Sequence, residues 1–550
     1  MPSLTSLILT PLITAFILLL IPGTLRVPIR LVAVLGAALT AWKAIWLFAA
    51  TEPGTAAIQF EQLIPWVTVA HFTVAYHVGV DGINIGLLLV AALVGFAAIC
   101  VSWDIEKQTK LFYVLLLTMI AGALGAFASL DLFFFYFFNE LALVPTFIMI
   151  GVWGRGPEKT YAAYKITLYL TLGAMTALAG LIALYVQSGA TSLDVIELQK
   201  HLALHPIPAA TQSWLFPLLL FGFGTLVGLF PFHSWAPDGY AAAPTATAMM
   251  HAGILKKAGL YALIRVAWPL LPDGVATWMP ILIWLTLGNL LFCGLVALRQ
   301  KNLNLLLANS SLAHMGFAFL GLASVSVIGM TGTVLVMIAH ALLAGLSFAL
   351  SGFLHARTGT LEMNRFGGLL KRLPYIGALM IACFMAGCGL PGFANFAGEL
   401  TVLFGAWKSA DLNLHGFVVA AAWSGLIIGA VYMLRAIRQI LHGELAVEWA
   451  DLGEFPTSEP LPPPEAEGHE ASTAGTTLTW ALHSALGGTL WAYWRRMPYA
   501  LLLGAMLLFG FAPGLLTTRI EPAVQAVIKA ALVRTAAPGS PNPTAVVANH

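Results

Sequence analysis

Ionisable side chains occur inside long apolar runs of this sequence, where they could bind and pass protons. Two adjacent lysines, Lys256 and Lys257, lie in the run MMHAGILKKAGLYALIRV. An ionisable group at the centre of a bilayer costs at least about 2.5–3.5 kcal/mol, so it normally faces the protein interior or water and has a partner. The candidates that we select in such runs are Asp131, Glu140, Lys165, His233, Lys256, Lys257, His314, His340 and Glu399. Amines, imidazoles and carboxylates distributed in this way are typical of a proton pathway.

Some members of this set also have a purely structural interpretation. His314 could be a hydrogen-bonded core histidine, and Asp131 could cap the helix that begins in SLDLFFFYFF. Lys43, near the end of its apolar run, is expected to extend to the membrane interface. Glu140 and Glu399 are harder to explain structurally because each lies deep in an apolar run.

The composition identifies the solvent around these groups. Of 550 residues, 59% are hydrophobic and only 9% are charged, against about a quarter charged in soluble domains. The chain is therefore expected to be an integral membrane protein, and its net charge of +2 argues against a nucleic-acid partner. The four cysteines show no metal-ligand spacing, and the sequence contains no haem-binding CxxCH motif. We therefore expect no metal and no cofactor in this chain.

Apolar runs of about 20 residues predict fourteen transmembrane helices. We place them at residues 4–22, 29–50, 83–103, 111–130, 132–151, 162–187, 214–234, 243–266, 277–298, 303–323, 328–354, 374–406, 415–440 and 498–516. Lys and Arg are concentrated in the odd-numbered loops, beginning with the loop between the first two helices. Because cytoplasmic loops carry excess basic residues, both termini are predicted on the outer side.

Three segments outside these helices have distinct compositions. Residues 191–205 have helical apolar spacing, with Asp194 near their start, and predict a short amphipathic helix. Residues 441–475 are acidic and proline-rich, which is typical of a flexible loop. Residues 476–494 are uncharged and long enough to cross the membrane, but their Gly pair and Trp-rich end favour a helix in the interface.

Two of the predicted helices contain breaks. Pro231 and Pro237 lie at the end of the seventh, and Gly389, Pro391 and Gly392 lie inside the twelfth. Broken helices are tolerated where they line a cavity, and they recur at matching places in inverted repeats. We therefore predict an all-α integral membrane fold of about 14 transmembrane helices, with inverted repeats in helices 4–8 and 9–13. The predicted division is 1–110 (helices 1–3), 111–266 (first repeat), 277–440 (second repeat), 441–497 (flexible loop with interfacial helix) and 498–550 (last helix and tail).

Several motifs resemble a known family. They are HVGVDGINIGLLL (77–89), FFNELALVPTFIMIGVWG (137–154), the stretch 230–266 with FPFHSWAPDG and AGILKK, SSLAHMGFAFLG (310–321) and GLPGFANFAGELTVLFGAW (389–407). They resemble the antiporter-like membrane-arm subunits of respiratory complex I, NADH-quinone oxidoreductase. The VDGI and LPGFANFAGE forms favour the M subunit over its L and N paralogues. The large subunits of Mrp antiporters are related.

The resemblance implies roles for individual residues. Glu140 matches the glutamate on the fifth helix, which pairs with a lysine on the seventh helix. Lys257 matches the central lysine that passes protons, and Glu399 matches the terminal acid on the broken twelfth helix. His314 and His340 match histidines that line the route between them.

One family feature is missing. His233 and Asp238 belong to the PxHxWxPD motif, and the family's seventh-helix lysine lies twelve residues before its aspartate, where this chain has Leu226. We hypothesise that Lys256 replaces the missing lysine as partner of the fifth-helix glutamate, because adjacent helical residues point about 100° apart. Lys165 is the alternative partner. Lys256 could instead extend to the interface or face a neighbouring subunit.

The resemblance implies a proton-translocating, non-redox subunit of an NADH:quinone oxidoreductase in the bacterial inner membrane. Its expected partners are the lipid bilayer, other antiporter-like subunits and, through them, the peripheral redox arm. Protons are expected to enter from the cytoplasmic side and to pass Lys257, His340 and His314 to Glu399. A subunit of an Mrp-type cation/proton antiporter or of a membrane-bound hydrogenase is the alternative, and a structural scaffold is a third.

Overall fold

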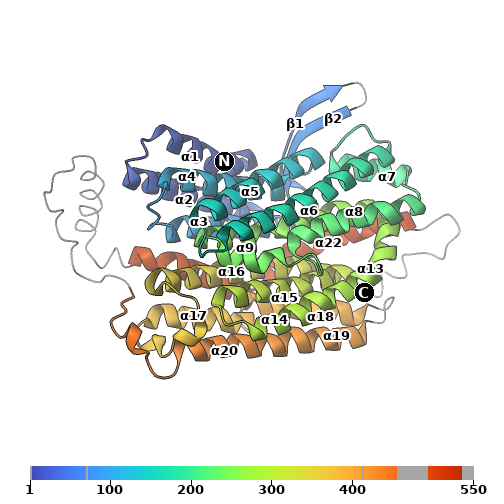
Figure 1. Ribbon diagram of the computed structural model, residues 1–550. Helices are drawn as coiled ribbons and strands as arrows, with labels where there is room; N and C mark the ends of the chain where they lie inside the picture. Colours follow the sequence, from blue (N-terminus) through green and yellow to red (C-terminus); the bar gives the residue numbers. More distant parts are fainter. Residues whose placement is uncertain (1–2, 70–71, 410–413, 455–492, 536–550) are drawn as a thin grey trace.

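The computed structural model describes residues 3–69, 72–409, 414–454 and 493–535 of the chain. Most of the long helices run along one common direction, as Figure 1 shows. Within these described ranges, nine helices are long and apolar enough to cross a membrane, and ten do so if the bent pair Tyr493–Phe511 and Gly514–Ala531 counts as one. Each of the fourteen predicted segments contains helix. The count of fourteen membrane crossings, the orientation of the termini and the five-part division stay predictions.

The helices follow the predicted segments closely. Their bounds are α1 Leu4–Leu20, α2 Arg26–Ala50, α3 Ile85–Val101, α4 Thr109–Ala128, α5 Leu132–Trp153, α6 Lys159–Ser188, α8 Ala209–Val227, α13 Pro272–Leu287, α14 Gly294–Arg299, α15 Leu303–Ala323, α16 Val327–Thr358, α17 Pro374–Gly387, α18 Ala394–Lys408, α19 His415–Ala422, α20 Gly429–Leu441 and α22 Gly514–Thr535. The predicted eighth helix is a continuous run of short pieces, α10 Thr245–Met250, α11 Lys257–Ala262 and α12 Trp268–Leu270 with two π-helical segments between them.

The fold is helical as predicted, and within the described residues a single β-hairpin is added to it. Strands β1 Gln59–Val69 and β2 Phe72–Val80 pair antiparallel between α2 and α3. In β2, His77 Nδ1 contacts the Asp194 carboxylate, and its Nε2 lies 2.8 Å from Glu61 Oε1. Residues 58–80 are rich in Val, Ile, Phe, Tyr and Trp, which is the signal of strands that sequence reasoning passed over.

Two predicted caps are confirmed at the same end of the molecule. Asp194 begins α7 (Val195–Leu204), the short amphipathic helix expected from residues 191–205, and its side chain accepts from two backbone amides. Asp131 likewise caps α5 by accepting from the amides of Phe133 and Phe134. Both carboxylates satisfy amides that a helix start leaves unpaired, which is the structural role considered for Asp131. The predicted interfacial helix at 476–494 lies almost entirely outside the described residues.

Both predicted breaks are present. Helix α8 ends at Gly228, whose φ of +90° suits glycine, and the chain turns before α9 (Trp235–Ala242). Between α17 and α18, Gly389 and Gly392 also have positive φ. A Cβ at Gly389 would lie 3.1 Å from Glu399 Oε2, so this glycine lets the broken backbone approach the carboxylate.

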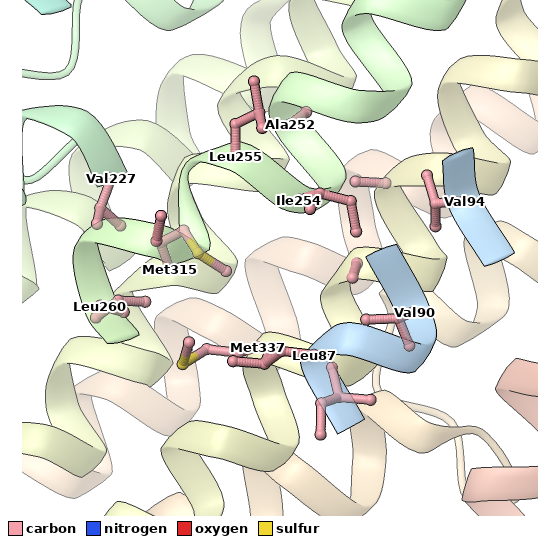
Figure 2. Close-up of a cluster of buried hydrophobic side chains, with 14 of the residues drawn as sticks. Leu87, Val90, Val94, Val227, Ala252, Ile254, Leu255, Leu260, Met315 and Met337 are labelled. Carbon is pink, nitrogen blue, oxygen red and sulfur yellow. The ribbon is translucent and has the colours of Figure 1, made fainter. Parts of the chain in front are cut away.

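The core is centred on α15 and α16. Among the described spans, the apolar window of α16 is completely buried and that of α15 is 94% buried. Figure 1 shows α16 between the N-terminal group of helices and the later helices α14 to α20. Figure 2 shows a cluster of buried apolar side chains in this core, some of them from the segment that carries Lys256 and Lys257. They are Leu87, Val90 and Val94 of α3, Val227, Ala252, Ile254, Leu255 and Leu260, Met315 of α15 and Met337 of α16.

Candidate functional site

Lys257 lies at a local change of helix type. Residues His251–Leu255 form a π-helical turn, in which Lys256 N donates to His251 O instead of to Ala252 O. The freed Ala252 carbonyl accepts a hydrogen bond of 2.6 Å from Lys257 Nζ. The lysine is 1% exposed. The π turn therefore supplies a buried oxygen for an ammonium that would otherwise lack one.

From Lys257 a series of close contacts leads across the core. Its Nζ lies 2.8 Å from His340 Nδ1 on α16. The His340 ring lies 5.5 Å, centroid to centroid, from the ring of His314 on α15. His314 Nε2 in turn lies 3.5 Å from Glu399 Oε1 on α18. These four residues, which we call the relay, come from four separate segments and are all buried.

Hydrogen-bond partners indicate the protonation of both rings. His314 Nδ1 lies 2.8 Å from Ser310 O, and a carbonyl can only accept, so Nδ1 carries hydrogen. Its Nε2 then faces Glu399 and can accept a proton from the carboxyl group. At His340, Nδ1 faces the ammonium donor, so Nε2 carries hydrogen in the neutral ring. His340 can thus accept a proton on Nδ1 and release one from Nε2, whereas His314 accepts and releases its proton at Nε2 because its Nδ1–H is bound to the Ser310 carbonyl.

Glu399 is 2% exposed and lies at the end of the relay. Its Oε1 has no hydrogen-bond partner within the described ranges, and the same is true of both side-chain polar atoms of Asn395, one turn earlier on α18. Tyr432 donates to Ser310 Oγ, so a second polar group borders this end of the relay. A buried carboxylate in this setting needs a proton, water or a cation.

Lys256 points away from Lys257. Its Nζ donates to both the carbonyl and the hydroxyl of Ser311 on α15, and the residue is 1% exposed. The predicted divergence of the two lysines is therefore present, but Lys256 faces α15 and not α5. A neighbouring pair of buried amines favours states in which they are not both charged.

Glu140 lies on α5 beside a cavity of about 130 Å³ between α5 and α6. Thr146 and Thr167 also line this cavity. Glu140 Oε1 is buried without a hydrogen-bond partner, and no ion pair of Glu140 occurs in the part of the chain that the structure describes. The hypothesised pair with Lys256 is absent in this conformation because Lys256 is bound to α15.

The alternative partner is also engaged elsewhere. Lys165 Nζ lies 2.6 Å from Asp238 Oδ2 on α9, and both side chains are partly exposed. His233 stacks on Phe230 with ring centroids 5.4 Å apart, and its Nδ1 is buried without a partner. The PxHxWxPD motif therefore connects α6 to the break after α8, and the structure does not join it to the relay.

Sequence reasoning missed two buried polar features. His251 is 1% exposed and lies 3.2 Å from the Tyr240 hydroxyl, one turn before the lysines. Its position six residues before Lys257 in an apolar run was the available signal. Arg265, at the end of the predicted eighth helix, is 5% exposed and lies 2.7 Å from Asp81 Oδ2. Its partner is the aspartate of the VDGI motif.

Comparison with known proteins decides the family. Residues 129–425 match the family described as NADH:quinone oxidoreductase/Mrp antiporter, TM, and they include all four relay residues. This match covers more than half of the chain. The chain belongs to this family. The resemblance inferred from the motifs is thereby confirmed, and so is the multi-pass membrane character expected from composition.

Relatives in the NADH:quinone oxidoreductase/Mrp antiporter family cover most of the sequence. NAD(P)H-quinone oxidoreductase chain 4 of Picosynechococcus is 35% identical over 450 residues, which are 80% of this chain and 82% of the relative. The corresponding chain of Thermosynechococcus vestitus is 34% identical over 454 residues, 82% and 84% of the two chains.

Solved structures share the fold. A chain of respiratory complex I from Thermus thermophilus has a TM-score of 0.79 at 29% identity, over 96% of this chain and 99% of that one. A chain of the Mrp complex from Dietzia has a TM-score of 0.78 over the same shares, but at 19% identity, which shows the fold alone.

Proposed function

We propose that this chain is a proton-translocating, non-redox membrane subunit of an NAD(P)H-quinone oxidoreductase. Electron transfer elsewhere in the complex would drive protons through its Glu, Lys and His side chains. The observation that carries the proposal is the unbroken series of buried contacts from Lys257 through His340 and His314 to Glu399. The names of the chain 4 relatives support the assignment to this type of complex.

The proposed transfer begins at Lys257, whose ammonium donates its proton to His340 Nδ1 while Nε2 releases another. The proton crosses to His314 through a bridging water or by ring rotation, because the two rings are in contact but no hydrogen bond joins them. His314 Nε2 then passes it to Glu399. Each step transfers one proton between groups that alternate between two protonation states, and no electron moves.

The membrane potential determines how far the pKa of a relay group must change during the cycle. Moving one proton against 100 mV takes about 2.3 kcal/mol, and one pKa unit corresponds to about 1.4 kcal/mol. The proton affinity of a relay group must therefore change by about two units during the cycle. Movement of a nearby charge is sufficient in scale. In our proposal Glu140 supplies that charge, with Lys256 as its coupled amine and Lys165 as the alternative.

The proposed setting is the bacterial inner membrane, with both termini on the outer side. Other antiporter-like subunits of the membrane arm would lie beside this chain and connect it to the peripheral redox arm. Protons would enter from the cytoplasmic side, near α8 and the lysine-bearing segment, and would leave to the outer side after Glu399. His233 belongs to this proposed cytoplasmic approach, because it lies at the break after α8.

Glu399→Gln tests the proposal. The amide keeps the shape of the carboxyl group but cannot exchange a proton, so proton pumping should fall to background in inverted membrane vesicles supplied with NADH and quinone. Glu158→Gln is the matched control, since Glu158 is an exposed acid in the loop before α6. Pumping should be normal in the control. Normal pumping in Glu399→Gln would support a structural scaffold instead.

A subunit of a cation/proton antiporter is the second candidate, because the Dietzia Mrp chain shares the fold over almost its whole length. Co-purification separates the two. Peripheral flavin and iron–sulfur subunits that co-purify with the chain would support the oxidoreductase. Co-purification of antiporter chains alone, with sodium-dependent proton exchange, would support the antiporter.

A further inference from the structure

A second polar cavity lies apart from the relay. Its volume is about 540 Å³, and it lies where α5 ends, α10 begins and α16 ends, beside the start of the helix Tyr493–Phe511. Polar and charged side chains of five segments line it, namely Asp104, Arg155, Thr245, Arg357, Arg495 and Tyr499. This is the face that carries the basic loops predicted to be cytoplasmic.

The cavity has more positive than negative charge. Arg495 pairs with Asp104, with Nη1 2.8 Å from Oδ1, so these two charges compensate each other. The guanidinium of Arg155 donates to the Thr245 hydroxyl, and that of Arg357 donates to the Glu454 carbonyl at 3.1 Å. Neither Arg155 nor Arg357 has a carboxylate partner in the described part of the chain. Two arginines therefore remain uncompensated.

Arg155 is partly buried. It lies in the loop after α5, and burial lowers the pKa of its guanidinium to about 10. A partly desolvated cation without a counter-ion is unfavourable, and an anion in the cavity would relieve this cost. His355, one turn from the end of α16, lies near enough to Arg155 to feel its charge, and it adds no negative charge.

The chemistry of the lining selects the kind of anion. A guanidinium presents a planar fork of donors that matches phosphate oxygens, and such bonds are charge-assisted. The rest of the lining is apolar and includes Val101, Ile105 and Ala349. This combination suits a phosphate group attached to an apolar body. Basic pockets between transmembrane helices on the cytoplasmic side bind the headgroups of anionic lipids.

We propose that this cavity binds a phosphate group, either of an anionic phospholipid headgroup or of free phosphate. The bound group would lie between the end of α5 and the end of α16 and would bridge Arg155 and Arg357. The inference does not depend on proton translocation, since none of the relay residues lines the cavity.

Native mass spectrometry of the purified complex provides the test. The probes are cardiolipin, which carries two phosphates, zwitterionic phosphatidylcholine and inorganic phosphate. We expect the wild type to retain cardiolipin in preference to phosphatidylcholine. Arg155→Gln/Arg357→Gln should weaken cardiolipin binding at least tenfold, which corresponds to about 1.4 kcal/mol. Arg372→Gln is the matched control, because this exposed arginine does not line the cavity, and it should bind as the wild type does.

A second variant guards against misfolding of the first. Ala356 is exposed and lines the cavity, so Ala356→Trp should fill it while all three arginines remain. It should lose cardiolipin binding. Displacement of cardiolipin by millimolar inorganic phosphate would identify free phosphate as a sufficient ligand, whereas resistance would identify the lipid. Equal retention of cardiolipin by the wild type, the double variant and Ala356→Trp would overturn the proposal.

Discussion

Replacing Lys257 should abolish proton pumping while changing the free energy of unfolding only slightly. In Lys257→Leu, the Ala252 carbonyl and His340 Nδ1 both lose the donor that lies 2.6 Å and 2.8 Å away. Each buried acceptor left unpaired costs about 1–3 kcal/mol. The same change removes a buried amine whose desolvation costs several kcal/mol. Because these terms oppose each other, we expect folded stability to change by no more than about 2 kcal/mol.

Proton pumping, unlike folded stability, should be lost in Lys257→Leu. Without Lys257 the first donor of the relay is absent, so we expect no pumping above background. Lys257→Arg gives a sharper test, because it keeps a positive charge beside His340. An arginine has a pKa of 12.5 or more, so on the order of 10⁻⁴ of it or less is deprotonated at pH 8. We therefore expect this variant to assemble and to pump no better than the leucine variant.

The assay compares quinone reduction with proton uptake in inverted membrane vesicles, normalised to the amount of assembled complex. Lys43→Leu is the matched control, since Lys43 is a lysine of α2 whose Nζ bonds to α1, far in sequence from the relay. It should pump normally. Normal pumping by Lys257→Leu at normal assembly would refute the relay, and normal pumping by Lys257→Arg alone would show that charge, not proton exchange, is what matters.

Two further predictions concern groups outside the relay. Lys256→Leu should leave the contacts of Lys257 intact but lower pumping, because the coupled amine bound to Ser311 is lost, and near-normal pumping would remove this role. In the hairpin, burial disfavours the charged form of His77, but its bonds to two carboxylates outweigh burial and raise its pKa. Its stabilisation is then complete below its ordinary pKa and is lost as pH rises through the raised value. Hydrogen-exchange protection of β2 and α7, corrected for intrinsic rates, should therefore fall as pH rises through the raised pKa of His77, and this dependence should vanish in His77→Gln but persist in His205→Gln.

The family and the candidate residues could be predicted from the sequence alone. Hydropathy located helix in every predicted segment, because the cost of exposing polar groups to lipid acts locally along the chain. Because a charged group in the bilayer is costly, the sequence alone marks Lys257 and Glu399 as candidate functional residues. The hairpin was missed because a single pair of strands carries a weaker hydropathy signal than a membrane-spanning helix, although its β-branched and aromatic residues favour strands.

The contact partners of the buried lysines were determined by the tertiary structure. The sequence placed Lys256 and Lys165 as alternative partners of Glu140, yet Lys256 is bound to Ser311 and Lys165 to Asp238. The physical reason is that a π turn changes which way the lysines point relative to a regular α-helix, and only the packed neighbours fix that turn. What the sequence by itself determined is which groups can exchange protons inside the membrane. The fold alone determined that Lys257, His340, His314 and Glu399 meet, because their contacts join residues up to 85 positions apart.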